Sequence, residues 1–435
     1  MEIMMPVSML HDMWRLNRQQ WAAEDDLRDL RFVKARGQIV RAWRYSPFYR
    51  ERFKSVGFQP NDFRTLDDLR RLPVVTKAEL TAAGEEAYCE DRKKSSRVWL
   101  KTSGSSGSPL SLPFTRADKA RRALKELRAL LANGYSFGDR MMILVEPRCL
   151  VEKQAWMQKL GFLRREYVSI FAEESQQLAK MRSLRPQVVY GYTSTLRILA
   201  DAILSDGARL SRPKILVSSA ELLDLSTRRL LKEAFGVEPV DFYGSMEFGW
   251  IAWQCSERRG YHVNSDCLIV ESLRDGRPAE PGQEGELVVT NLHSDAAPLI
   301  RYATGDAGVL GREKCSCGRS LPLLTAISGR LVDFLVRPDG HKLSPYVVTC
   351  AIEDVPGVRQ FQVVQTSPDE VTVHLIASTD RSTVEQVRTA VASAMGIGTR
   401  IVVEQASSLS PEPNGKFKVV KSMIRPGDQA LLRAG

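Results

Sequence analysis

The chain has 435 residues, 43% of them hydrophobic and 26% charged, which is typical of a folded globular protein rather than a disordered one. This length is too great for one compact core and predicts two or three domains. The formal net charge of +10 favours anionic partners. Because its lysines and arginines are scattered and form no aromatic-basic ladder, nucleic acid is not an expected partner.

No uninterrupted apolar stretch approaches the ~18 to 20 residues that a membrane-spanning helix needs, so no membrane association is expected. Residues 1–21 lack a basic leader, an apolar core and a small-residue cleavage site, so no signal peptide is predicted. The seven cysteines are an odd number in a large chain, which disfavours a disulfide framework. We therefore expect a cytoplasmic protein.

Residues 1–100 have a helical, basic pattern without strand-like alternation, which predicts a helical lead-in. Apolar residues at helical spacing over 123–131 predict a helix that ends at Asn133-Gly134. Buried strands are predicted at residues 141–145, 187–192 and 214–221, with helical patterns such as residues 225–235. This alternation predicts βαβ units and a parallel sheet.

The pattern changes after about Cys255. Alternating segments at residues 267–273 and 285–292, with glycine and proline between them, predict an antiparallel or barrel-like β subdomain over residues 255–328. From Gly329 onward, hairpin, helix and strand patterns predict a small α+β unit of ~100 residues. The expected fold class is therefore α/β: an N-terminal domain of residues 1–329, with a βαβ parallel sheet and a β subdomain, and a C-terminal α+β domain of residues 330–435.

A short loop rich in serine and glycine, TSGSSGSP, occupies residues 102–109. Its glycines let backbone N–H groups turn towards an anion, and its hydroxyl groups add donors. It is not a Walker loop, because no Gly-Lys-Ser/Thr follows the second glycine. Such a tract is often a flexible linker, but strand-like segments bound this one on both sides. The expected phosphate-binding residues are Thr102, Ser103, Gly104, Ser105, Ser106 and Gly107.

With that loop, the sequence resembles the adenylate-forming superfamily of acyl-CoA synthetases, and within it the phenylacetate–coenzyme A ligase branch. The resemblance extends over nearly the whole chain. Its motifs, in order, are SPFYRE at 46–51, LPVVTK at 72–77, TSGSSGSP at 102–109, SSAE at 218–221, DFYGSMEFG at 241–249, PLIRYATGD at 298–306, CSCGR at 315–319, SGR at 328–330 and PNGK at 413–416.

The resemblance implies an ATP site with Mg²⁺. Glu247 would bind Mg²⁺, a hard cation that prefers carboxylate oxygen. Asp306 would accept hydrogen bonds from the ribose hydroxyls, and Arg330 would contact ribose or phosphate. Phe242 and Tyr243 could offer an aromatic face to adenine. The remaining nucleotide-binding residues implied are Ser219, Ala220, Glu221, Asp241, Gly244 and Ser245.

Lys416 follows an Asn-Gly turn, where a lysine taken alone would be a solvated charge. The resemblance implies instead that it swings in with a mobile C-terminal lid and stabilises the charge that moves in the adenylation transition state. Lys416 and Glu247 are thus the expected catalytic residues.

Two positions depart from the family pattern. Met246 stands where Ser or Thr usually precedes the magnesium glutamate, and Ser245 could partly replace the lost hydroxyl. Val332 stands where Asp is common, two positions after Arg330. These departures bear on the rate and on the domain-rotation step.

The residues around the nucleotide motifs are apolar or aromatic, with no lysine or arginine among them: Tyr190, Tyr192, Phe242, Tyr243, Met246, Phe248 and Trp250. Such a pocket buries rings well and offers no partner to a second carboxylate. We therefore expect the substrate to be an aromatic or other compact hydrophobic carboxylic acid, with Tyr192, Met246 and Trp250 lining its pocket.

Cys255, His262, Cys315 and Cys317 form a Cys₃His set, which matches the number and type of ligands that structural zinc prefers. The spacing is less regular than in a zinc finger, and four unlinked buried residues would be the alternative. The resemblance of CSCGR and of the upstream Cys and His to metal-binding members of the branch favours a structural Zn²⁺.

Three functions fit the sequence. The first is adenylation of an acid followed by transfer to coenzyme A, and the second is adenylation followed by transfer to an amine or a carrier-protein thiol. The third is a non-catalytic nucleotide-binding relative, which Met246 favours but Lys416, Asp306 and Glu247 oppose. The family also suggests a possible homodimer.

Overall fold

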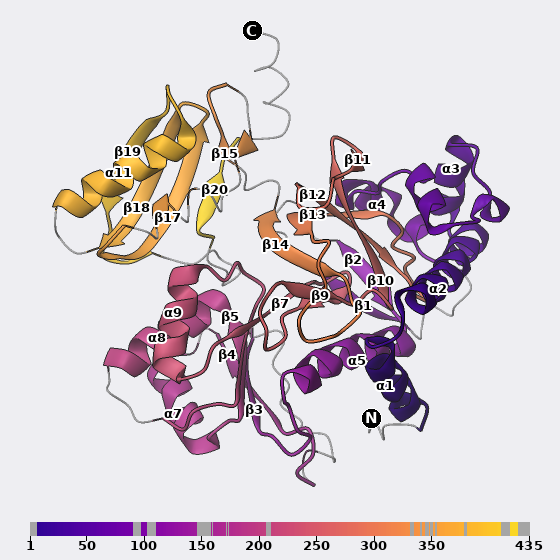
Figure 1. Cartoon of the computed structure of the whole chain (residues 1–435), viewed down its shortest axis with the longest axis horizontal. Coiled ribbons are helices and arrows are strands. Elements are labelled where there is room, and N and C mark those ends of the chain that lie inside the picture. The colour runs from indigo at the N-terminus through magenta and orange to yellow at the C-terminus, as the bar shows by residue number, and fades with distance from the viewer. Residues whose placement is uncertain are drawn as a thin grey trace. The chain divides into compact units, whose positions relative to one another are not determined.

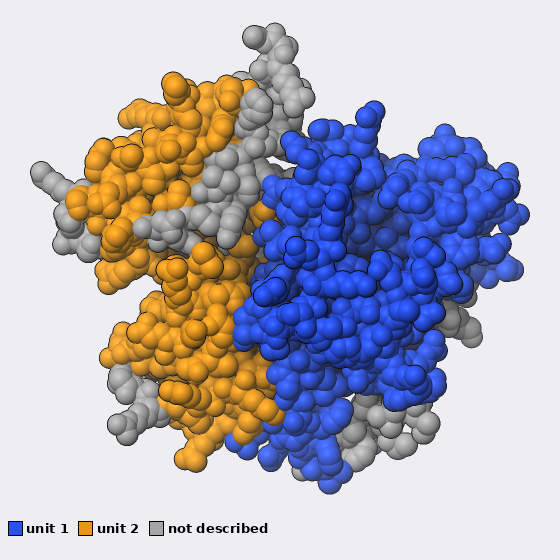
Figure 2. All heavy atoms as spheres, viewed as in Figure 1, with its two compact units in different colours: residues 1–141, 152–165, 240–327 blue, residues 142–151, 166–239, 328–435 orange. Residues whose placement is uncertain are grey.

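The computed structural model describes residues 7–89, 97–101, 110–145, 158, 160–170, 172, 174–205, 210–330, 335–339, 342–343, 348, 351–352, 355–377, 381–409 and 418–424. The predicted phosphate-binding residues 102–107, Val332 and Lys416 lie outside these ranges. The chain divides into two compact units (Figure 2), of which unit 1 comprises residues 1–141, 152–165 and 240–327, and unit 2 comprises residues 142–151, 166–239 and 328–435.

Unit 1 begins with helices between residues 7 and 87, whereas the end of the helical lead-in predicted for residues 1–100 contains a strand that starts at Val98. The elements are α1 (Val7–Gln19), α2 (Glu24–Tyr45), α3 (Pro47–Ser55), η1 (Pro60–Asp62), η2 (Leu66–Arg71), α4 (Lys77–Ala83) and η3 (Gly84–Ala87). Ser46 caps α3 by accepting a hydrogen bond from the Tyr49 N–H, and Pro47 occupies the first turn. Thr76 and Glu79 form a capping box at the start of α4.

The LPVVTK segment connects these helices to the strands of unit 1. The Val75 N–H donates to the Arg301 carbonyl at 2.8 Å, and the Ala303 N–H donates to the Val75 carbonyl at 2.8 Å. Val75 and Tyr302 thus form a parallel bridge. This pairing fixes the start of the PLIRYATGD strand, which carries Tyr302 and Asp306.

The main sheet of unit 1 is largely antiparallel, as predicted for residues 255–328. Its strands are β7 (Val240–Ser245), β8 (Gly249–Trp253), β9 (Tyr261–Val263), β10 (Leu268–Arg274), β11 (Arg277–Pro278), β12 (Glu284–Asn291), β13 (Tyr302–Leu310) and β14 (Leu323–Arg330). They lie in the order β11-β10-β12-β13-β14-β9-β8-β7. Closure into a barrel stays a prediction.

Helix α5 (Arg116–Ala132) follows the short antiparallel pair β1 (Val98–Lys101) and β2 (Ser111–Phe114). A capping box of Thr115 and Asp118 starts α5, and the helix ends at Asn133 as predicted. It lies beside α1 (Figure 1). Arg128 of α5 forms an ion pair with Asp266 at 2.6 Å, and both side chains are 0% exposed.

The first part of unit 2 is an α/β layer. It contains β3 (Met141–Val145), β4 (Arg165–Ser169), α7 (Glu174–Leu184), β5 (Val188–Tyr192), α8 (Thr193–Ser205), β6 (Ile215–Ser219) and α9 (Leu225–Phe235). The strand order is β6-β5-β3-β4, and β5 pairs with β6 in parallel, which confirms the predicted βαβ unit. Leu196, Leu199 and Leu231 join the strands in one buried core.

The second part of unit 2 is the α+β segment predicted at the C-terminus. It contains β15 (Leu335–Val336), β16 (Lys342–Leu343), β17 (Val358–Ser367), β18 (Glu370–Ala377), α11 (Arg381–Met395), β19 (Arg400–Gln405) and β20 (Val420–Ser422). Its four-stranded sheet has the order β19-β18-β17-β20, and α11 covers one face (Figure 1). Val363, Val373 and Val387 belong to a core formed within this segment. The boundary at 329/330 and the mobility of the segment stay predictions.

Among the described residues, no helix has both the length and the apolar composition required to cross a membrane. The cytoplasmic location and the homodimer expected from the sequence stay predictions.

Candidate functional site

The β7–β8 hairpin of unit 1 carries the DFYGSMEFG motif, and its turn at residues 246–248 presents Glu247. Close approach of the two strands requires Gly244, because a Cβ there would lie 2.5 Å from the Gly249 carbonyl oxygen. Gly249 has φ +65°, a conformation that favours glycine. Both glycines of the motif therefore shape the turn.

The two aromatic residues of β7 have different environments. Phe242 is 1% exposed and packs edge-on against Trp250, with 5.5 Å between ring centroids. Tyr243, the next residue, points to the opposite face of the strand and donates a hydrogen bond from its hydroxyl to Asp306 Oδ2 at 2.7 Å. Of the two, Tyr243 is thus the ring beside the predicted ribose-binding carboxylate.

A second tyrosine–carboxylate pair lies in the same unit. The Tyr302 hydroxyl donates to Glu247 Oε1 at 3.0 Å, and Tyr302 is 2% exposed. Burial, together with the Asp306 carboxylate, raises the pKa of Tyr243 well above its ordinary value, so its hydroxyl remains a donor at neutral pH. A tyrosine hydroxyl therefore orients each of the two carboxylates predicted to lie in the ATP site, Asp306 and Glu247.

Two other motif residues have hydrogen bonds within the fold. Asp241 Oδ2 accepts from the Tyr261 hydroxyl at 2.7 Å, while the Asp241 N–H donates to Gln254. Ser245 Oγ accepts from the Phe248 N–H at 3.4 Å. Ser245 thus supports the turn, and its replacement of the family hydroxyl at Met246 stays a prediction, as does a nucleotide contact by Asp241.

The remaining described nucleotide residues lie in unit 2, where β5 and β6 end. Tyr192 pairs in register with Ser219, so both stand at the carboxyl edge of parallel strands, the usual place for ligands in α/β sheets. Ser219 Oγ donates to the Tyr190 hydroxyl at 2.9 Å. Ala220 has φ +67°, a strained conformation for a residue with a Cβ that is typical of functional turns.

Glu221 follows Ala220, and its carbonyl accepts from Thr193 Oγ1 at 3.2 Å. Thr193 Oγ1 also bonds Ser218 Oγ at 2.7 Å, so this turn is tied to the start of α8. Arg330 is the last residue of β14, and the structure describes its backbone alone. Its predicted contact with ribose or phosphate stays a prediction.

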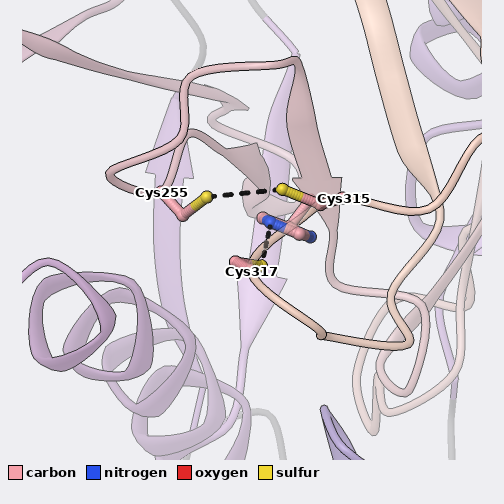
Figure 3. Close-up of side chains that lie close together, drawn as sticks. Cys255, Cys315 and Cys317 are labelled. Carbon is pink, nitrogen blue, oxygen red and sulfur yellow. Dashed lines mark hydrogen bonds between the residues drawn. The ribbon is translucent and has the colours of Figure 1, made fainter.

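The four residues predicted to bind zinc come together in unit 1. Their ligand atoms all lie within 4.8 Å of one another. Cys255 Sγ is 3.7 Å from Cys315 Sγ, and Cys317 Sγ is 3.3 Å from His262 Nε2. Figure 3 shows the three labelled cysteines converging from two segments of the chain. Cys255, Cys315 and His262 are buried.

Burial and neighbouring groups change the pKa values of three residues of the cluster. Burial, followed by the nearby Arg319, lowers the pKa of His262 to about 4, so the imidazole is neutral at pH 7. Burial raises the pKa of Cys255 to about 12. Partial burial also acts on Cys317, but hydrogen bonds from Arg319 outweigh it and lower its pKa. With a pKa this high, Cys255 would lose its proton at neutral pH only beside a bound cation.

Arg319 of CSCGR connects the cluster to the N-terminal helices. Its guanidinium lies over the Trp21 ring at 4.7 Å and over Trp253 at 5.5 Å, and its Nε donates to Gln20 Oε1 at 2.9 Å. The Ser320 N–H donates to the Gln20 carbonyl at 2.8 Å. No local pattern predicts this contact, because Arg319 and Gln20 are 299 positions apart in the sequence.

Sequence reasoning also missed three residues around Glu247: Tyr302, Arg122 and Lys125. Tyr302 lies in the PLIRYATGD motif, but nothing in that motif predicts its hydrogen bond to Glu247. Arg122 and Lys125 stand on α5 without any motif, and their contacts reach residues more than 120 positions away.

Known proteins resemble the chain in sequence and in fold. A family model described as "CapK C-terminal domain" matches residues 335–423. The phenylacetate-coenzyme A ligase of Thermus thermophilus is 27% identical over 343 residues, covering 77% of each chain. That of Escherichia coli is 26% identical over 332 residues, covering 74% of this chain and 75% of the relative. Protein CapK of Staphylococcus aureus is 23% identical over 397 residues, covering 87% and 86%.

Among solved structures, 2-hydroxyisobutyryl-CoA ligase in the postadenylation state with 2-HIB-AMP has a TM-score of 0.78 at 22% identity, covering 96% of this chain and 93% of that chain. ATP-bound MatB from Rhodopseudomonas palustris has a TM-score of 0.56 at 16% identity, covering 78% and 70%. The fold is therefore that of the adenylate-forming ligases. In sequence, the chain is similar to phenylacetate-coenzyme A ligases over about three quarters of its length.

Proposed function

We propose that this protein is an AMP-forming acid–CoA ligase, which activates a carboxylic acid with ATP and transfers the acyl group to coenzyme A. The observation that carries the proposal is the pair of oriented carboxylates, Glu247 held by Tyr302 and Asp306 held by Tyr243. Both belong to motifs shared with the branch, and relatives 26–27% identical are phenylacetate-coenzyme A ligases.

In the proposed first step, a carboxylate oxygen of the acid attacks the α-phosphorus of ATP, and pyrophosphate leaves. Glu247 would hold Mg²⁺, which fits a carboxylate ligand and would neutralise phosphate charge. Tyr243 donates to Oδ2 of Asp306, and the other carboxylate oxygen would accept hydrogen bonds from the ribose hydroxyls. Lys416 and Arg330 would complete the nucleotide site as the resemblance implies.

In the proposed second step, the thiol of coenzyme A attacks the acyl carbonyl, AMP leaves with the bonding electrons, and the thiol proton passes to solvent. Coenzyme A is proposed as the acyl acceptor because four relatives of this chain are named phenylacetate-coenzyme A ligase. Transfer to an amine or a carrier-protein thiol is the alternative outcome of the test below.

We propose an aromatic or compact hydrophobic acid as substrate. In unit 1, Met246 and Trp250 are half-buried, and the Trp250 ring is held by Phe242. In unit 2, the half-buried Tyr192 stands at the carboxyl edge of β5. Each of these side chains is apolar or aromatic, which favours a hydrophobic acid.

We also propose that Cys255, His262, Cys315 and Cys317 bind a structural Zn²⁺. Zinc–sulfur bonds of ~2.3 Å in a tetrahedron place sulfur ligands ~3.8 Å apart. The distance of 3.7 Å between Cys255 and Cys315 fits this value. Because all four positions are protein ligands, the ion would stabilise the fold and leave no position for substrate.

The decisive experiment is ATP–pyrophosphate exchange over a panel of aryl, arylacetic, fatty, dicarboxylic and amino acids. Coenzyme A is then added to the active acids, and the thioester and AMP are measured. Acid-dependent exchange followed by thioester formation supports the proposal. Exchange without a thioester identifies a different acceptor, and exchange that is highest with dicarboxylates refutes the substrate class. Absence of exchange with every acid contradicts the enzymatic function.

A further inference from the structure

The turn that carries Glu247 is held by two cations from α5. Arg122 Nη1 donates to the Met246 carbonyl at 2.8 Å and to the Glu247 carbonyl at 3.1 Å. Lys125 Nζ donates to the Phe248 carbonyl at 2.6 Å. Arg122 and Lys125 are three positions apart, so they lie on the same face of the helix. All three carbonyls of the turn at residues 246–248 therefore have a cationic donor.

This arrangement is built into the packing of unit 1. The Arg122 guanidinium lies over the Phe114 ring at 4.8 Å. Gly249 lies beside the Arg122 side chain, since a Cβ built there would be 3.4 Å from Arg122 Cζ, an ordinary contact distance. Lys125 is 4% exposed. Burial lowers the pKa of Arg122 to about 10 and that of Lys125 to about 8, which reflects the cost of keeping two cations here.

The Glu247 side chain is fixed from the other direction. Tyr302 donates to Glu247 Oε1 at 3.0 Å, and its ring packs on Phe248 with 5.8 Å between centroids. The backbone of Tyr302 is held by its bridge to Val75. The backbone of the turn is thus held by α5, and the carboxylate is held by β13.

We infer that Arg122, Lys125 and Tyr302 are positioning residues that hold Glu247 where it can bind Mg²⁺. This inference rests on the proposed function of Glu247. A side chain on a two-strand turn has several orientations, and a metal ligand that must be ordered on binding binds more weakly. The hydrogen bonds of the two cations go to backbone carbonyls, and the charge of Arg122 also acts on the Glu247 carboxylate.

The test uses Arg122→Met and Tyr302→Phe, with Arg121→Met as the matched control. Arg121 precedes Arg122 on α5, but it contacts the His293 carbonyl and Asp295 rather than the hairpin. The first readout is hydrogen exchange of peptides spanning residues 240–253 in the ligand-free protein. We expect faster exchange in Arg122→Met and wild-type exchange in that segment for Arg121→Met.

The second readout is the Mg²⁺ concentration that gives half-maximal ATP–pyrophosphate exchange. We expect an increase of ~10-fold in Arg122→Met and ~3-fold or more in Tyr302→Phe, with the KM for the acid unchanged. Arg122→Lys should give an intermediate value, because a shorter side chain with a flexible ammonium group replaces the Nη1 donor that serves both carbonyls. If Arg122→Met does not fold, Arg122→Lys and Tyr302→Phe provide the same two measurements.

The inference is overturned if the Mg²⁺ dependence of a folded Arg122 variant equals that of wild type, or if its hairpin exchanges at the wild-type rate. A lower kcat alone, with unchanged Mg²⁺ dependence, would identify a merely structural role and also overturns it. If wild-type protein exchanges pyrophosphate with no acid, the proposed enzymatic function fails. The hydrogen-exchange comparison then still decides whether α5 positions the hairpin.

Discussion

Replacement of Asp266 by Asn should destabilise unit 1 strongly. Arg128 Nη1 and Nη2 donate to the two Asp266 oxygens at 2.6 and 2.9 Å, and both side chains are 0% exposed. Arg128 also donates to Asn264 Oδ1 and to the Leu16 carbonyl. In Asp266→Asn the guanidinium stays buried without its counter-charge.

The expected loss is about 3–5 kcal/mol of unfolding free energy, since removing one partner of a buried ion pair leaves an uncompensated charge. This is a large part of the ~5–15 kcal/mol that stabilises a typical domain. For a unit of this size it corresponds to a decrease in Tm of roughly 6–20 °C.

The assay is urea unfolding followed by tryptophan fluorescence, together with a thermal scan, on Asp266→Asn, Arg128→Met and the double variant. The double variant should lose less unfolding free energy than the two single variants lose together, because it leaves no unpaired buried charge at this site. Asp25→Asn is the control. Its pair with Arg28 has side chains that are 82% and 63% exposed, so a loss below ~0.5 kcal/mol is expected. A loss below ~1 kcal/mol in Asp266→Asn would refute the reasoning.

The same pair gives a pH dependence of known sign. Burial raises the pKa of Asp266, but the charge and hydrogen bonds of Arg128 outweigh it, so its pKa in the folded protein lies below the ordinary value. A depressed carboxyl pKa contributes stability above the unfolded value of ~3.9, and this stability is lost as the pH falls through the folded pKa. The difference in stability between wild type and Asp266→Asn should therefore be complete at pH 7 and shrink below ~pH 4.

Three further outcomes are expected. Lys416→Ala should lower adenylation by at least ~10²-fold while leaving thioester formation from supplied acyl-AMP nearly intact; equal losses in both half-reactions would contradict this. Tyr243→Phe should raise the KM for ATP by ~10-fold, because Asp306 loses a charge-assisted hydrogen bond, and an unchanged KM would argue against the ribose role. Protein purified without a histidine tag should contain about one zinc per chain, decreased in Cys317→Ser; less than ~0.2 zinc per chain would exclude the site.

The regular elements were largely predictable because their signals are local. The apolar runs at residues 141–145 and 187–192 correspond to β3 and β5, and the helix stop at Asn133 is the end of α5. The start of α5 was not located, although Thr115 and Asp118 form a capping box that the sequence displays. Helix boundaries of this kind depend on side-chain contacts over three residues, which periodicity alone does not reveal.

The candidate site was predictable only where a motif or a distinctive donor type marked it. The proximity of the four Cys and His residues was predicted because these residue types are specific metal ligands, although Cys255 and Cys315 are 60 positions apart. The partnership of Tyr302 with Glu247 spans 55 positions and involves residue types that are common in cores. Such pairs depend on how strands are placed in the sheet, and no local pattern encodes that placement.

Helix α5 shows why a chain would keep buried cations instead of apolar side chains. The turn at residues 246–248 leaves its carbonyls without strand partners, and each unsatisfied buried carbonyl costs ~1–3 kcal/mol. Leucine at position 122 or 125 would fill the volume but could not donate to Met246 or Phe248. The charges of Arg122 and Lys125 are thus a consequence of exposing Glu247, and the Arg128–Asp266 pair anchors the helix that carries them.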